Sequence, residues 1–467
     1  MKKFICLILS VLLAVAAVGC KSRRRPQVSD DYEVNLHPDA NVSATLRVAT
    51  TNFDGEKKII SDIGALLKKK YPNVKVKIEP FSGAISTQYA SWYNAGDVPD
   101  ILINNTFDMF TLSDKGILLN LDPYLDAEKK DAESDFDIND YYEAYFKMGQ
   151  DKFDGAQYMI PRSADRVVCH YNKAIFEAAG VDMTKVRNGW TWDDMLAACA
   201  KLRTWLDANG MSGVYCLEPN LTSWLSTSVP MLATFGNDVI SESGKNVIAE
   251  AGTAETLNLL REMVEKRYIP DSQTTVGSGF EQGSCAMYFQ SMAISQLANK
   301  KVFWKDGKFD AGKLDLVTFP LIGVGEEGAK DYSKAKIGAG IAGYCISRTS
   351  SNKSLAWAFL RYLLSKGGQQ EMALNGLNLA SIRKDLTDPK TANWGKGYDA
   401  LNLEAYTWGS EYKMSPEFFQ YTKIGAKKGI DTAIKELFVD GTNMKVTVDK
   451  AISNCKNAID VAISSAQ

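Results

Sequence analysis

Segments with the pattern of strands alternate with segments that have the pattern of helices from residue 44 onward. Residues 45–50 (TLRVAT) are typical of a strand, and apolar side chains recur at helical spacing over 56–70. A half-buried strand pattern follows at 74–78, then a helical pattern that ends at Gly96, and a short apolar strand at 101–103. Strands connected by helices form a mostly parallel sheet that is covered on both faces. The sequence therefore predicts an α/β fold.

Polar residues follow two of these strands directly. Asn52 comes after the first strand, and Asn105, Thr106 and Asp108 come after the strand at 101–103. In parallel sheets, ligands bind beyond the carboxyl ends of the strands, so these four residues are candidate ligand contacts. Asparagine and aspartate also form turns by bonding their own backbone, which is the alternative role for Asn105 and Asp108.

The stretch 158–172 (YMIPRSADRVVCHYN) has the pattern of a crossing between two lobes. Ile160-Pro161 ends the preceding element, because proline removes a backbone donor and disfavours helix in the residue before it. Arg162, Ser163 and Asp165 follow and are all able to bond a polar ligand, and a β-branched strand comes next. A solvated polar turn is the alternative interpretation.

The composition of the chain excludes several function classes. The formal net charge is -2, so no basic field attracts nucleic acid. The only histidines are His37 and His170, which leaves no Ser/His/Asp triad and no metal cluster to build on. We therefore expect no cofactor, no metal and no nucleic-acid partner. Residues 44–467 are too many for one core and are enough for two large domains.

The N-terminus has the pattern of an export signal. A basic start precedes an apolar run over 4–18, which is too short to span a bilayer comfortably. The run ends in Ala17-Val18-Gly19-Cys20, which resembles the lipobox of bacterial lipoproteins. This resemblance implies a signal peptide over 1–20 and lipid attachment at Cys20, with a plain signal peptide as the alternative. Residues 21–43 lack hydrophobic periodicity and predict a disordered tether.

No later segment is apolar over enough length to span a bilayer, so we expect the body to lie outside the membrane and to be held by the lipid. The six cysteines after Cys20 have no CxxC spacing and mostly have apolar neighbours. This pattern favours buried thiols, with pairing of some of them as the alternative in an exported protein. The six are Cys169, Cys199, Cys216, Cys285, Cys345 and Cys455.

Several blocks of the sequence resemble, in order, the extracellular solute-binding proteins of ABC transporters. The first reads GDVPDILINNTFDMFTLSDKGILLNLDPYL, and the crossing stretch matches that family's pattern of I-P-x-x-x-D, an apolar strand and Y-N-K-x-x-F. Later blocks match its T-W-x-x-L helix start, its F-x-x-G-x-A-A-M strand, and its glycine-rich strand with the helix that follows. The blocks lie at 96–125, 160–176, 180–196, 280–287, 338–347, 352–353 and 356–364.

The resemblance implies a periplasmic-binding-protein-like fold, with two α/β lobes joined by a multi-strand hinge. Lobe one would comprise residues 44–165 and 317–346, and lobe two residues 166–316 and 347–467, which include the C-terminal helices. Such lobes close on a ligand without chemistry, and hinge residues absorb the backbone change. Glycines at 338, 340 and 343 suit a hinge, while close backbone packing is their alternative role.

The resemblance also implies a function: capture of a small polar solute, a mono- or oligosaccharide, and its delivery to the permease subunits of an ABC importer by a monomeric binding protein. Asp165 lies where many relatives place an acid that accepts from sugar hydroxyls, and Arg162 would hold a carboxylate or pair with Asp165. In relatives that bind carbohydrate, Gly and Trp often follow the strand at 285–290, where this chain has Ser291, Met292 and Ala293. The further candidate contacts are Trp224, Gln290, Tyr344 and Arg383.

Two alternatives to this function stay open. One is an exported carbohydrate-active enzyme that uses Asp108 and Asp165 as a carboxylate pair. The other is a binding protein for a solute that is not a sugar.

Overall fold

The computed structural model of the chain describes residues 32–466, and the segments left out within that range are short apart from 322–335. The chain divides into a unit of residues 1–34 and a unit of residues 35–467, and the account below concerns the second. The proposed signal peptide with Cys20, most of the predicted tether and Trp224 lie outside the described residues. The gaps are 152–153, 164, 222–224, 242, 251, 275–278, 292–293, 322–335, 341, 373–379, 391, 393, 412 and 416–423.

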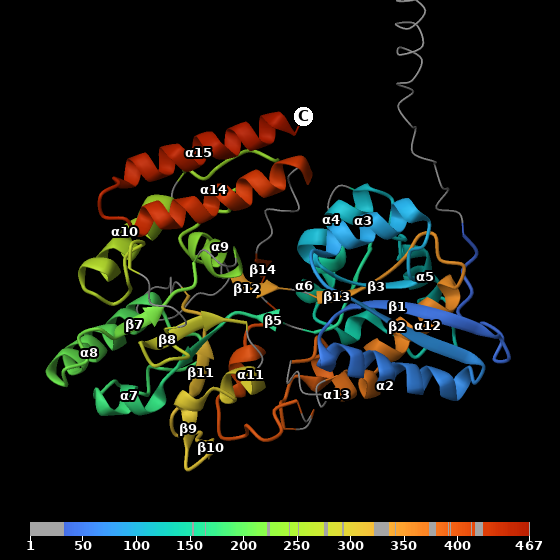
Figure 1. Cartoon of the computed structure of the whole chain (residues 1–467), viewed down its shortest axis with the longest axis horizontal. Helices are drawn as coiled ribbons and strands as arrows, with labels where there is room; N and C mark the ends of the chain where they lie inside the picture. Colours follow the sequence, from blue (N-terminus) through green and yellow to red (C-terminus); the bar gives the residue numbers. More distant parts are fainter. Residues whose placement is uncertain are drawn as a thin grey trace, which may run out of the picture. The chain divides into compact units, whose positions relative to one another are not determined.

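The first sheet has five strands in the order β2-β1-β3-β13-β4, and β1, β2, β3 and β13 are labelled in Figure 1. Strand β1 pairs in parallel with both β2 and β3, as the alternating pattern predicts, and β13 pairs antiparallel with β3 and with β4. The strands are β1 (Ala44–Thr51), β2 (Val74–Phe81), β3 (Ile101–Asn105), β4 (Ile160–Pro161) and β13 (Ala342–Ile346).

Helix α2 (Asp54–Lys70) is amphipathic, because its isoleucines and leucines repeat at helical spacing and its last turn consists of lysines. It buries Ile59, Ile60, Ile63 and Leu67. Helix α12 (Lys353–Leu364) packs against α2 and β13 with an almost continuous apolar face. The other helices of this lobe are α3 (Ile85–Ala95), α4 (Thr106–Asp114), α5 (Asp122–Glu128), α6 (Glu143–Phe146) and α13 (Lys366–Met372).

The second sheet has four strands in the order β11-β6-β8-β7. These are β6 (Val168–Tyr171), β7 (Tyr215–Glu218), β8 (Cys285–Gln290) and β11 (Asp315–Thr318). Its helices are α7 (Lys173–Ala178), α8 (Trp192–Ala208), α9 (Leu225–Thr234), α10 (Thr253–Glu265), α11 (Ile294–Ala298), α14 (Ile424–Thr442) and α15 (Val448–Ser465). Helices α14 and α15 lie side by side and pack on α10 (Figure 1). Helix α8 begins with the predicted cap, because Thr191 and Asp194 form a capping box.

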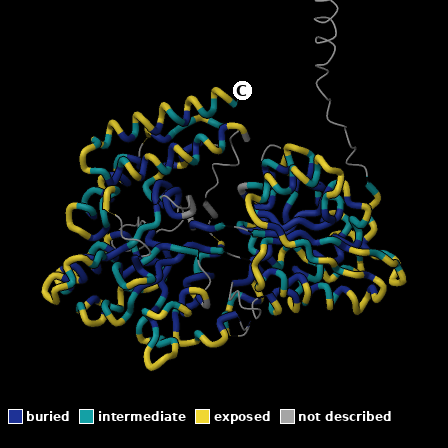
Figure 2. Tube along the Cα trace, in the orientation of Figure 1, coloured by how far each residue is buried: buried dark blue, intermediate teal, exposed yellow. Residues whose placement is uncertain are grey.

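Both sheets form the centres of apolar cores, whereas exposed residues gather on the outer faces of the helices (Figure 2). The six cysteines after Cys20 are buried free thiols, which confirms the interpretation favoured by the sequence. Within the described residues, no helix is both long enough and apolar enough to cross a bilayer.

A third sheet of three short strands connects the two larger ones. Strand β5 (Asp165–Arg166) lies between β4 of the first sheet and β6 of the second, so the stretch 158–172 does pass from one sheet to the other. Strand β12 (Lys336–Gly340) leads back into β13, and β14 (Lys413–Ser415) precedes α14. Strand β12 pairs with both of the others. Three separate passages of the chain are therefore bonded together where the lobes meet.

The lobe boundaries differ from the expected ones in two places. Residues 317–318 belong to the second lobe, because β11 pairs with β6 over its whole length. Helices α12 and α13 belong to the first lobe, because both pack on α2. The assignment of 347–467 to lobe two was therefore wrong for this segment. An apolar strand or helix of this kind fits either core, and only the tertiary contact decides between them.

The three glycines expected at the hinge lie in two different sheets. Gly338 and Gly340 lie on β12 in the connecting sheet, while Gly343 lies on β13 in the first sheet, opposite Pro161. A Cβ atom added at Gly343 would lie 2.3 Å from the carbonyl oxygen of Ile160. Gly343 therefore serves close backbone packing.

We predict that Gly343→Ala lowers the free energy of unfolding by about 1–3 kcal/mol, because a methyl group here forces the paired strand away. Chemical denaturation measures the change. Gly213→Ala is the matched control, since a Cβ atom there meets nothing within 4 Å. Equal effects of the two substitutions would contradict the close-packing role.

Candidate functional site

Polar side chains gather where β1 and β3 end. Ala49 lies opposite Leu102 in the parallel pairing of these strands, and the same register continued sets Asn52 level with Asn105. Asn52 is exposed, Asn105 is half-buried and Thr106 is buried. The structure thus brings three of the predicted contacts to one edge of the first sheet.

Asn105 and Asp108 bond each other at the start of α4. The Asn105 side-chain oxygen accepts from the backbone N–H of Asp108 at 2.8 Å, and its amide donates to an Asp108 carboxylate oxygen at 3.0 Å. Asn105 is therefore the N-cap of the helix. The turn-forming role considered from the sequence is present in the structure, and it fixes the orientation of both side chains.

Backbone pairing brings the crossing stretch to the same place. Asn105 lies opposite Ala342 on β13, and Asp165 lies opposite Gly340 on β12. Asn105 and Asp165 therefore lie on either side of the short junction between β12 and β13. Gln290, at the end of β8, pairs with Val168, which follows Asp165 closely on the crossing stretch. Predicted contacts from both large sheets thus converge on the connecting sheet.

A buried chain of polar contacts runs from the core of lobe one to Asp165. Glu56, in the first turn of α2, accepts a hydrogen bond from the Tyr344 hydroxyl and forms an ion pair with Arg162, with 3.1 Å between Nη2 and Oε2. Arg162 donates from Nη1 to the Ser163 hydroxyl at 2.8 Å, and that hydroxyl donates to Asp165 at 3.1 Å. Arg162 therefore pairs with Glu56 and reaches Asp165 through Ser163.

The charged groups in this polar network and their burial have opposite effects on the pKa values of Asp165 and Arg162. Burial raises the pKa of Asp165, while the charge of Arg162 and the Ser163 hydrogen bond lower it. Burial by itself lowers the pKa of Arg162, but the nearby Glu56 and Asp165 outweigh it and raise that pKa. Asp165 is half-buried and therefore offers a carboxylate oxygen beside the buried positive charge of Arg162.

Lys427, on α14, interacts electrostatically with Asp108 of the candidate site. It was not identified from the sequence. Burial lowers the pKa of its amine to about 8, and the charges of Asp108 and Asp431 oppose that shift. Asp108 of lobe one therefore acts electrostatically on a lysine of the C-terminal helices. The neighbouring Lys428 is exposed, and nothing in the sequence pattern distinguishes the two residues.

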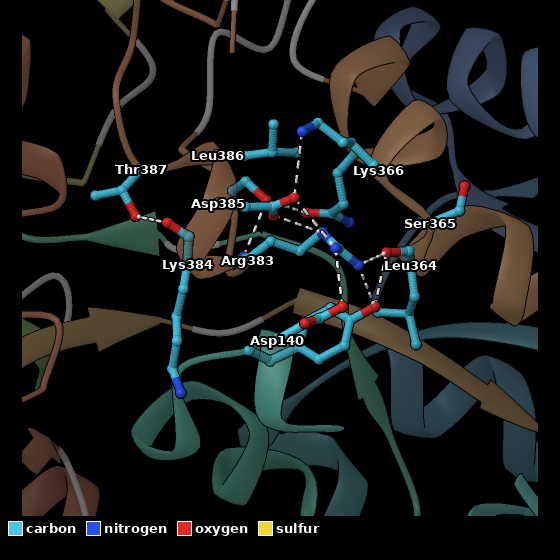
Figure 3. Close-up of polar contacts among 12 residues, drawn as sticks. Asp140, Leu364, Ser365, Lys366, Arg383, Lys384, Asp385, Leu386 and Thr387 are labelled. Carbon is cyan, nitrogen blue, oxygen red and sulfur yellow. Dashed lines mark hydrogen bonds and ion pairs between the residues drawn. The ribbon is translucent and has the colours of Figure 1, made fainter. Parts of the chain in front are cut away.

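Two predicted contacts are bonded to other residues inside the protein. Tyr344 is fully buried on β13, and its hydroxyl bonds Glu56. Arg383 is buried, and its guanidinium donates to Asp140 at 3.0 Å and to Asp385 at 2.8 Å (Figure 3). Tyrosine and arginine occur in buried networks as well as in binding sites, so the sequence does not separate the two roles, and the assignment of Tyr344 and Arg383 as ligand contacts stays a prediction. The described residues include no group of three His, Cys, Asp or Glu side chains able to hold a metal ion.

Residues 50–370 match the sequence profile of a family described as bacterial extracellular solute-binding protein. The arabinooligosaccharide-binding protein of Halalkalibacterium halodurans is 26% identical over 238 residues, which are 48% of this chain and 47% of that protein. The chain spans about half to three fifths of the length of the curated relatives it matches.

Solved structures share the fold over almost the whole chain. The sugar-binding protein MalE of Xanthomonas citri has a TM-score of 0.71 at 17% identity, covering 90% of this chain and 98% of that one. UgpB of Mycobacterium tuberculosis, solved in complex with glycerophosphocholine, has a TM-score of 0.68 at 16% identity, covering 91% of this chain and 99% of that one. The periplasmic-binding-protein-like fold implied by the sequence is thereby confirmed.

We predict that Glu56→Ala lowers the free energy of unfolding by about 3–5 kcal/mol, because it leaves the Arg162 charge buried without its partner. Glu56→Leu combined with Arg162→Met recovers part of this loss, since neither charge then remains. Lys58→Ala is the control on the same helix, and it removes an exposed ion pair with Asp62 that contributes little. Denaturant titration of the four proteins checks this, and a Glu56→Ala effect as small as that of the control would contradict it.

Proposed function

The chain belongs to the family of bacterial extracellular solute-binding proteins, and we propose that it captures a small polar solute between its two lobes and delivers it to an ABC importer. Members of the family are binding proteins outside the cytoplasm. The proposal rests on the convergence of Asn105 and Asp165 at the β12–β13 junction, because this is where polar groups of lobe one meet the crossing between the lobes.

The proposed contacts bind a solute by hydrogen bonds without chemistry. Asn52 and Asn105 offer amide donors and acceptors from lobe one, Gln290 offers an amide at the end of β8, and Asp165 offers a carboxylate at the crossing. Thr106 and Asp108 complete the lobe-one set, although the Asp108 carboxylate already accepts from Asn105. Sites of this type fix a ligand with a few converging polar groups.

We propose a mono- or oligosaccharide as the solute. Sugar hydroxyls both donate and accept, and the proposed site contains both amides and a carboxylate. The arabinooligosaccharide-binding relative and the MalE structure carry names consistent with this choice. An enzyme that uses Asp108 and Asp165 is disfavoured, because Asn105 fixes Asp108 as part of a helix cap.

A solute that is not a sugar is the second candidate, and Lys427 is the observation that favours it. Burial lowers the pKa of this lysine to about 8, yet it lies within the electrostatic reach of Asp108 beside the proposed site. A cation in such a place suits an anionic group such as a phosphodiester, and UgpB was solved with glycerophosphocholine.

We further propose that Cys20 carries a lipid and that the segment 21–43 tethers the binding unit to the membrane. In this arrangement the protein acts as a monomer that docks on the permease subunits of its importer. Closure on the solute would bend the three strands of the connecting sheet together, since hinge residues take up the backbone change.

We predict that Asp165→Ala abolishes the stabilisation that the solute gives, while the unliganded protein keeps its fold. A ligand at 100 times its dissociation constant adds about 2.7 kcal/mol, which a thermal-shift screen over glycans and phosphodiesters detects in the unmodified protein. Asp193→Ala, which changes an exposed acid in the first turn of α8, is the control. If Asp165→Ala gains the same melting shift as the unmodified protein, the crossing is not part of the site.

A further inference from the structure

A cavity lies in lobe two, at one end of the second sheet. It has a volume of about 440 Å³, and its lining includes Tyr171, Asp315 and Trp408. Asp315 lies opposite Tyr171 at one end of the β6–β11 pair, whereas Val168, at the other end of β6, pairs with Gln290 near the crossing. The cavity therefore belongs to the opposite end of the second sheet from the proposed solute site.

The floor of the cavity is a fixed polar network. Asp315 accepts from the backbone N–H of Asn402 at 2.7 Å and from the Tyr171 hydroxyl at 3.2 Å. The side-chain amides of Asn188 and Asn402 bond each other in both directions, at 3.2 and 3.0 Å. Asn402 also donates to the carbonyl of Leu316 at 2.9 Å. Because Asn402 is bonded to strand β11 and Asn188 is bonded to Asn402, the floor is preorganised.

The rim carries an aromatic ring and two charged side chains. Trp408 is half-buried, while Glu404 and Arg187 are exposed, and all three line the cavity. The backbone N–H of Trp408 donates to the carbonyl of Glu404 at 2.7 Å. This turn holds the ring and the carboxylate on one short segment, and both residues line the cavity.

We propose that this cavity is a second carbohydrate-binding site, independent of the solute site at the crossing. An indole ring covers the apolar face of a sugar, and the carboxylate, guanidinium and amide groups pair with hydroxyls, which both donate and accept. The Asp315 carboxylate already accepts from Asn402 and Tyr171, so the exposed Glu404 and Arg187 are the charges that meet a ligand. These two charges balance, which fits a neutral glycan. With few contacts, the dissociation constant is on the order of 1 mM.

A second site of this kind would act through effective concentration. A glycan held weakly on lobe two keeps its other residues near the protein, which raises their local concentration at any further site within reach. This consequence applies to chains longer than the solute that the lobes enclose.

Fluorine NMR of the full chain labelled with 5-fluorotryptophan tests the proposal directly. The variant Trp408→Phe identifies the Trp408 resonance, which is then followed during titration with maltotriose and with cellotriose. We expect a saturable shift with at least one trisaccharide, retained in Asp165→Ala and weakened about tenfold in Glu404→Gln, the effect of losing one charge-assisted hydrogen bond. Glu265→Gln, an exposed acid at the end of α10, leaves the titration unchanged.

Several results would overturn the second site. A Trp408 resonance that moves no more with the trisaccharides than with glycerol excludes carbohydrate recognition. Saturation by choline chloride alone shows that the cavity takes a cation. A trisaccharide shift that disappears in Asp165→Ala shows that Trp408 senses the site at the crossing. In contrast, a Trp408 shift that persists when Asp165→Ala has lost its thermal stabilisation supports both sites separately.

Discussion

The buried ion pair between Glu56 and Arg162 determines where the chain leaves lobe one. Two charges out of water are costly, and their attraction compensates only when the remaining donors and acceptors are satisfied. Here the Tyr344 hydroxyl donates to Glu56 and the Ser163 hydroxyl accepts from Nη1 of Arg162, whereas Nε of Arg162 has no partner among the described residues. The pair links the first turn of α2 to the residues directly before β5, and it therefore sets the position of Asp165 through Ser163. This one contact therefore connects helix α2, the strands of the crossing and the candidate site.

Each lobe has its own sheet and core, and three short strands are bonded to one another between them. Strand β12 pairs with β5 on one side and with β14 on the other. Because the backbones share hydrogen bonds, a displacement of one strand either carries its neighbour with it or breaks those bonds. The arrangement restricts relative motion to conformations that keep three strands in register, which favours a hinge with few degrees of freedom.

Local sequence patterns predicted the helices and strands well. Features that depend on contacts between residues distant in the sequence could not be predicted. The parallel strands, the capping box at Thr191 and the buried thiols all follow from neighbours in the sequence. The edge that gathers Asn52 and Asn105 was also predictable, since strand ends in a parallel sheet lie together. The partner of Arg162 was not predictable, because in the sequence Glu56 has only the pattern of an acidic residue in the first turn of a helix. The same holds for Lys427, whose burial depends on the packing of α14, and for α12, whose apolar face fits either lobe.

The buried thiols make the two lobes separately observable. Cys345 lies on β13 in the first sheet, while Cys169 and Cys285 lie on adjacent strands of the second. Burial raises the pKa of all three, so each is protected from thiolate chemistry while its sheet stays closed. The rate at which an alkylating reagent modifies each cysteine therefore records how often its own lobe opens. A protein whose lobes share three hydrogen-bonded passages thus carries internal markers of whether the halves unfold together or one at a time.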